Sequence, residues 1–106
     1  MRLNDYQLAA IDTAIYPKDQ GIAYCALGLG GEAGECLDKV KKMIRDNATS
    51  DYDMEGIAKE LGDVLWYTAN LAHELGYSLE TIAEWNVAKL ASRKKRGKLQ
   101  GSGDNR

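Results

Sequence analysis

The sequence predicts an all-α protein built as an antiparallel four-helix bundle. Three observations support this class: the chain has a single proline, no segment alternates apolar and polar residues as a strand does, and apolar residues recur at intervals of three and four. Short connections between the helices favour antiparallel neighbours. With 106 residues the chain forms one domain that has little interior for an enclosed site. We therefore expect a bundle-like protomer whose active site is completed by oligomerisation.

The first two helices are predicted from their boundaries and their apolar faces. The first runs from a cap at Asn4 or Asp5 to the break at Pro17. The second is long and ends in the polar stretch 46–51, which has the composition of a loop. Its inner face consists of apolar residues at helical spacing: Ile22, Cys25, Leu29, Ala33, Cys36, Leu37, Val40 and Ile44.

The third and fourth helices carry clearer end signals. The third runs from about Asp53 to Gly76, a C-terminal stop. Its inner face consists of Ile57, Leu61, Val64, Leu65, Thr68 and Leu71. Ser78 can cap the fourth helix, which runs from Leu79 to about Arg93 and whose inner face is unusual in mixing apolar and polar residues. These helices make residues 1–97 one helical domain, and the glycine-containing segment 98–106 is expected to be a flexible tail unless a ligand or partner orders it.

Composition excludes several classes of protein. The formal net charge of −2 provides no global field that would attract nucleic acid or an anionic membrane. Cys25 and Cys36 lie among apolar residues without metal-ligand spacing, so we expect reduced, packed thiols. No apolar run approaches the length that spans a bilayer, and the first residues lack a signal-peptide pattern. These features predict a cytoplasmic protein without a membrane partner.

Two matched pairs of acidic residues are the strongest functional signal. Glu32 and Glu35 share a helical face, as do Glu60 and Asp63, and both pairs lie beside apolar stripes. Four carboxylates at a helix interface would repel one another and resist desolvation unless a cation compensates. Hard oxygen ligands favour Mg²⁺ or Mn²⁺, and two divalent ions would balance four negative charges. The alternative is that the acids are ordinary residues of exposed helix surfaces.

Glycines lie within both acidic motifs. The segments read Glu-Ala-Gly-Glu at 32–35 and Glu-Leu-Gly-Asp at 60–63. A glycine inside a helix costs about 0.5–1 kcal/mol relative to alanine, so close approach of backbones or room for a ligand should compensate. We therefore expect the two helices to approach closely at Gly34 and Gly62.

The ordered motifs resemble those of the MazG-like nucleotide pyrophosphohydrolases, which carry Glu-x-x-Glu, a spacer and then Glu-x-x-Asp. The resemblance spans about residues 20–97 and includes Asn86-Val87-Ala88-Lys89-Leu90 followed by Arg93. It implies an all-α homodimer or homotetramer and Mg²⁺-dependent hydrolysis of nucleoside triphosphates between the α- and β-phosphates. The products would be a nucleoside monophosphate and pyrophosphate.

The resemblance implies that Glu32, Glu35, Glu60 and Asp63 are metal ligands. Bound Mg²⁺ would hold the phosphate oxygens, while a carboxylate orients or deprotonates the attacking water. Glu32 and Glu35 are the candidate catalytic residues, and the sequence does not determine which is the base.

Other polar residues are candidate substrate ligands. Asn86, Lys89 and Arg93 share one helical face and look like the family's phosphate-binding Asn-x-x-Lys-x-x-x-Arg, although a solvated face near a helix end would have the same pattern. Lys39 lies four residues after Glu35 and Tyr67 four residues after Asp63, so both could line the site.

The competing hypothesis is a non-enzymatic helical oligomer that binds a nucleotide, or that binds nucleic acid through the basic segment 93–98. The negative net charge argues against nucleic acid. The sequence leaves the preferred base and sugar, the dimer or tetramer, and a role in clearing damaged nucleotides or adjusting pools open.

Overall fold

The computed structural model describes residues 1–48 and 53–106, and confirms the all-α class. Its elements are α1 (Leu3–Asp12), the short 3₁₀ helix η1 (Lys18–Gln20), α2 (Gly21–Arg45), α3 (Met54–Glu74) and α4 (Leu79–Lys95). No strand occurs among these residues. Part of the predicted 46–51 loop, residues 49–51, lies outside the described residues. None of the helices described is both long enough and apolar enough to span a membrane.

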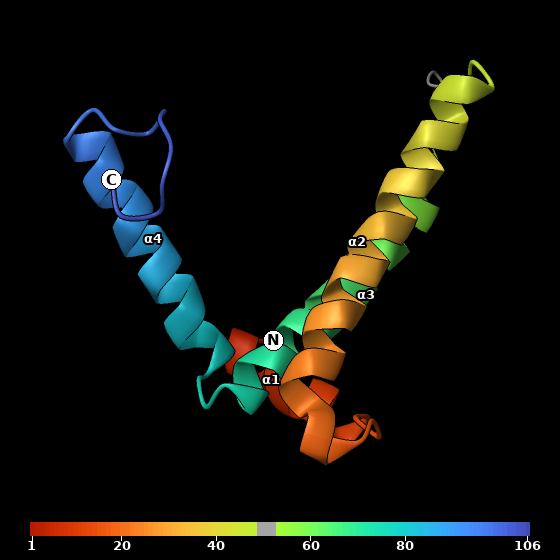
Figure 1. Cartoon of the computed structure of the whole chain (residues 1–106), viewed down its shortest axis with the longest axis horizontal. Coiled ribbons are helices and arrows are strands. Elements are labelled where there is room, and N and C mark those ends of the chain that lie inside the picture. The colour runs from red at the N-terminus through yellow and green to blue at the C-terminus, as the bar shows by residue number, and fades with distance from the viewer. Residues whose placement is uncertain (49–52) are drawn as a thin grey trace.

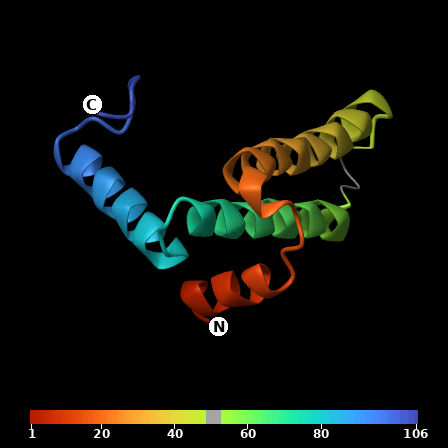
Figure 2. The same ribbon diagram turned by 60° about the horizontal axis from the view of Figure 1, so that its bottom comes forward.

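Helix α3 is the centre of the protomer. It packs along α2 on one side and along α1 on the other, while α1 and α2 do not pack against each other (Figure 2). The described core is small and lies where α1, α3 and the start of α4 meet, with Ala10, Ala69 and Leu79 fully packed and Tyr6 and Trp66 partly buried around them. Much of the apolar surface of α2 and α3 therefore stays exposed in a single chain.

Several helix ends follow local sequence signals. The Asp53 side chain accepts a hydrogen bond from the Gly56 amide at 2.9 Å, and the Ser78 hydroxyl accepts one from the Thr81 amide at 3.1 Å. Gly76, with φ of 85°, follows the end of α3 in a conformation that favours glycine. The predicted starts and stops of α3 and α4 are therefore confirmed to within a few residues.

The first helix differs from its prediction at both ends. It begins at Leu3 rather than at an Asn4 or Asp5 cap, and the Asn4 side chain instead bonds Glu80 at the start of α4. It ends at Asp12, well before Pro17, because the following residues leave the helix to make tertiary contacts. Tyr16, for example, is buried and donates a hydrogen bond to a Glu74 carboxylate oxygen at 2.6 Å.

Helix α4 points away from α2 and α3, so one chain has the shape of an open V (Figure 1). It packs on α1 and α3 near its start, and within the described residues it has no packing contact with α2. Its apolar residues are distributed around the helix rather than along one stripe, so no single face can pack onto the other helices. Trp85 and Val87 are 57% and 66% exposed as a result. The four predicted helices are present, but α4 does not close a bundle within one protomer.

Candidate metal centre

The pairing of α2 with α3 brings three predicted metal ligands together. Glu32 on α2 and Glu60 and Asp63 on α3 each offer a carboxylate oxygen, and these oxygens all lie within 4.8 Å of one another. Glu60 and Asp63 are three residues apart on one helix, so both side chains reach the same interface. Hard oxygen donors at this spacing suit Mg²⁺ or Mn²⁺.

The fourth predicted ligand, Glu35, is not part of this group. Its side chain is exposed, whereas Glu32 is half-buried. Three residues along an α-helix leave an angular offset of about 60°, so the rotation of the helix decides whether both side chains of such a pair or only one faces the neighbouring helix. On α3 both Glu60 and Asp63 face α2, whereas on α2 only Glu32 joins the group. A metal-ligating or catalytic role for Glu35 therefore stays a prediction.

These carboxylates have little compensating positive charge among the described residues. Partial burial, together with the negative charges of Asp63 and Glu60, raises the pKa of Glu32 above its ordinary value. Among the described residues, neither Glu32 nor Asp63 forms an ion pair, and Glu60 meets only Lys39, whose Nζ lies 3.8 Å from its Oε1. An excess of negative charge at a helix interface fits a divalent cation.

Two of the predicted substrate residues border this cluster. Lys39 is held beside it by Glu60, with 37% of its side chain exposed. The Tyr67 ring is half-buried among aromatic neighbours, 4.9 Å from Trp66 and 6.5 Å from Tyr24 between ring centroids. Desolvation, with contributions from Tyr24 and the Glu32 charge, raises the Tyr67 pKa. The structure thus places Lys39 against Glu60, and Tyr67 lies near enough to Glu32 for that charge to raise its pKa.

The close approach of α2 and α3 occurs at a different glycine from those predicted. A Cβ atom at Gly34 or Gly62 would meet no neighbouring atom within 4 Å, so the expectation of tight contact there is wrong. A Cβ at Gly28 would instead collide with the ring of Tyr67. Gly34 and Gly62 lie on exposed helix surfaces. Gly28 lies about one turn before Glu32 on α2, and the Tyr67 ring packs directly over it.

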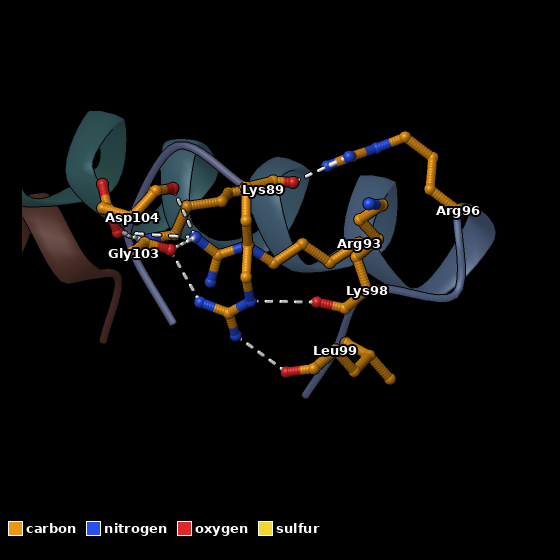
Figure 3. Close-up of polar contacts among 8 residues, drawn as sticks. Lys89, Arg93, Arg96, Lys98, Leu99, Gly103 and Asp104 are labelled. Atoms are coloured by element: carbon orange, nitrogen blue, oxygen red, sulfur yellow. Dashed lines mark hydrogen bonds and ion pairs between the residues drawn. The ribbon is translucent and has the colours of Figure 1, made fainter. Parts of the chain in front are cut away.

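The remaining predicted substrate residues lie on α4, away from the acids (Figure 1). Lys89 and Arg93 contact the segment 98–106, which folds back onto α4 (Figure 3). A pocket of about 310 Å³ is lined there by Ile82, Trp85, Asn86, Lys89 and Asp104. The structure therefore confirms that the three polar residues share a face of α4, but one chain does not bring them to the acidic cluster.

A second pocket, of about 390 Å³, lies at the start of α2 and includes Glu74 in its lining. Glu74 is fourteen residues beyond Glu60 on α3, about 21 Å along the helix axis. This pocket contains none of the predicted site residues.

Comparison with known proteins assigns a family to most of the chain. Residues 20–97, which include α2, α3 and α4, match the MazG nucleotide pyrophosphohydrolase domain. The chain is 47% identical to the "Gene 37 protein" of Mycobacterium phage L5, with the whole of both chains covered. No solved structure matches the chain.

Proposed function

The chain belongs to the MazG nucleotide pyrophosphohydrolase family, and we propose that it hydrolyses nucleoside triphosphates between the α- and β-phosphates to a nucleoside monophosphate and pyrophosphate. The observation that carries this proposal is the juxtaposition of Glu32, Glu60 and Asp63 within 4.8 Å, without an ion-pair partner for two of them among the described residues. A bound divalent cation would offset the repulsion among these carboxylates and would in turn bind the oxygens of a polyphosphate.

The metal ligands in this proposal are the three clustered acids, joined by Glu35. A bound Mg²⁺ ion, for which Mn²⁺ could substitute, would neutralise charge on the phosphate oxygens. Glu32 and Glu35 are the candidates to orient the attacking water and accept its proton. Glu35 suits this task because its carboxylate is exposed and lies outside the group of three acids whose oxygens lie within 4.8 Å of one another.

Substrate binding draws on two surfaces. Lys39 and Tyr67 border the acids and could contact the phosphates and the nucleoside. Asn86, Lys89 and Arg93 offer an amide and two cations, which suit phosphate oxygens, but α4 directs them away from the acids of their own chain. We therefore propose that α4 of a second copy completes the site, in a homodimer or homotetramer.

The open V of the protomer supports this assembly. Exposed apolar residues occur on α2, α3 and α4, including Leu27, Leu61 and Trp85, which are 77%, 55% and 57% exposed. Apolar surface on this scale is typical of chains that bury it against a partner. Sedimentation equilibrium should give a dimer or tetramer, and a monomer at catalytic concentrations would contradict the shared site.

The activity is tested with a panel of ribo- and deoxyribonucleoside triphosphates, with and without Mg²⁺, by detection of released pyrophosphate. We expect release that requires Mg²⁺ and that is lost in Glu35→Gln and Glu60→Gln. Glu84→Gln is the matched control, because Glu84 is exposed on α4 and forms no ion pair within the described parts of the chain. Nucleotide binding without pyrophosphate release from any substrate would instead identify a binding protein.

A further inference from the structure

The segment after α4 is a folded strap, which we define as residues 98–106. The chain reverses at Gly97, where φ is 68°. The Arg106 guanidinium then donates hydrogen bonds to the main-chain oxygens of Lys98, Leu99 and Gly103, at 3.1, 2.8 and 2.7 Å. In the structure this segment, which the sequence predicts to be flexible unless a ligand or partner orders it, forms a loop closed by one arginine side chain.

A second contact ties this loop to the helix. The Arg96 guanidinium donates to the main-chain oxygen of Arg106 at 2.7 Å. Gly103, with φ of 87°, makes the turn that presents the next residue to α4. The strap therefore has a defined position over one face of α4.

That face carries the two cations of the proposed phosphate-binding set. A carboxylate oxygen of Asp104 lies 2.7 Å from Lys89 Nζ and 3.6 Å from Arg93 Nη2. The Arg93 guanidinium also donates to the main-chain oxygens of Gly103 and Asp104. As a result only 7% of the Arg93 side chain is exposed, although it lies in the last turns of a surface helix.

The strap presents to these cations the same chemistry as a phosphate group. The Asp104 carboxylate and the main-chain oxygens accept the hydrogen bonds of Lys89 and Arg93 that phosphate oxygens would otherwise accept. The hydrogen bond and charge of Lys89 lower the pKa of Asp104, which is therefore ionised at neutral pH. Its side chain is nevertheless 75% exposed, so the contact can open without disturbing the helical core.

We propose that the strap is an internal competitor for the phosphate-binding face of α4, with the Asp104 carboxylate occupying Lys89 and Arg93 until a phosphate ligand displaces it. This inference rests on the proposed function only in assigning phosphate to that face. The equilibrium between the closed and the open strap is the same whichever ligand is present. The strap therefore lowers the affinity of every ligand that binds this face of α4 by one common factor.

The test is calorimetric titration of the full chain and of Asp104→Asn with inorganic pyrophosphate and inorganic triphosphate. Neither titration requires hydrolysis. A partly exposed ion pair of this kind corresponds to about a two- to fivefold change in affinity. We expect Asp104→Asn to bind both ligands more tightly by the same factor in this range. Equal or weaker binding by the variant would overturn the proposal.

Matched controls separate competition from a general charge effect. Asp12→Asn removes the same charge from an exposed position in α1 that has no ion pair in the described regions, and should bind both ligands as the unmodified chain does. An equal gain in Asp12→Asn would show that net charge alone is responsible and would overturn the proposal. Removal of residues 101–106 should reproduce the gain, whereas a loss of pyrophosphate affinity would show that the strap helps to bind phosphate and would also overturn it.

These measurements are distinguishable from the test of the proposed function. The protein could release no pyrophosphate from any nucleotide while Asp104→Asn still binds pyrophosphate and triphosphate more tightly by the same factor. That result would support the strap as a competitor on an anion-binding face and contradict the proposed function. A chain that hydrolyses nucleotides but shows no gain would retain the proposed function and lose the strap mechanism.

Discussion

Neutralising Glu32 should stabilise the metal-free protein, because this residue is held against two other carboxylates. At a separation of 4.8 Å, two unit charges repel by about 0.9 kcal/mol in water and more at the lower effective permittivity of a protein surface. Glu32 faces Glu60 and Asp63 and has no ion pair among the described residues. With solvent screening of these partly exposed groups, Glu32→Gln should raise the free energy of unfolding by about 1–2 kcal/mol at pH 8.

The gain should depend on pH in a defined direction. Burial and neighbouring charge raise the Glu32 pKa above its ordinary value of 4.5, so the folded protein holds this proton more tightly than the unfolded chain does. The repulsion weakens as Glu32 is protonated at low pH, and it develops as the pH rises through the raised pKa. The unmodified protein should therefore lose stability over this interval, and the contribution of Glu32 to that loss should be absent from Glu32→Gln.

Thermal unfolding in a chelator, followed by circular dichroism, measures both effects. For a domain of this size, each kcal/mol corresponds to about 4–8 °C in Tm. Addition of Mg²⁺ should stabilise the unmodified protein by about 2.7 kcal/mol at one hundred times its Kd, and the variant by less. Glu84→Gln should show neither effect. If Glu32→Gln is no more stable than the unmodified protein at pH 8, or if its gain is equally large at pH 4, the acids are not an electrostatically strained cluster.

Three further substitutions test the helix contacts. Gly28→Ala should destabilise the fold by about 1–2 kcal/mol in urea titration, because the added Cβ displaces the Tyr67 ring, and unchanged stability would show that α2 and α3 separate easily. Gly34→Ala should instead raise the free energy of unfolding by up to about 1 kcal/mol and leave pyrophosphate release unchanged, since its Cβ enters open space. Lower stability or lower activity in this variant would show that α2 and α3 do approach closely at this position. Gln7→Leu should cost about 2–3 kcal/mol, because the buried Gln7 amide makes three hydrogen bonds to main-chain atoms at 3.0–3.1 Å, and a neutral effect would show that water replaces them.

Much of the fold is predictable because its signals are local. A capping Asp53, a capping Ser78 and a positive-φ Gly76 define helix ends through contacts within a few residues, so the sequence alone suffices to place them. The grouping of Glu32 with Glu60 and Asp63 also follows from helical spacing once α2 and α3 are taken as neighbours.

The features that were not predicted depend on tertiary geometry. Periodicity assigns Glu35 to the same face as Glu32, but it does not resolve the rotation that leaves one of them facing solvent. The identity of the glycine at the helix contact depends on where the Tyr67 ring lies, which is a long-range contact. The position of the strap depends on hydrogen bonds from Arg106 to main-chain oxygens, and these oxygens are present in every residue whatever the sequence.

The segment that matches the family and the unit of folding are different in this protein. The family match begins at residue 20, so it leaves out α1 entirely. Yet α1 supplies Gln7, whose amide bonds the main chain at Ala69, Tyr77 and Leu79, and Asn4, whose amide bonds Glu80. A fragment cut at the boundary of the family match would therefore keep every proposed site residue and lose one of the two helices that hold the start of α4. The first ten residues of the chain, which lie outside the segment that defines the family, therefore help α3 to set the direction of the fourth helix and the place at which its cations lie.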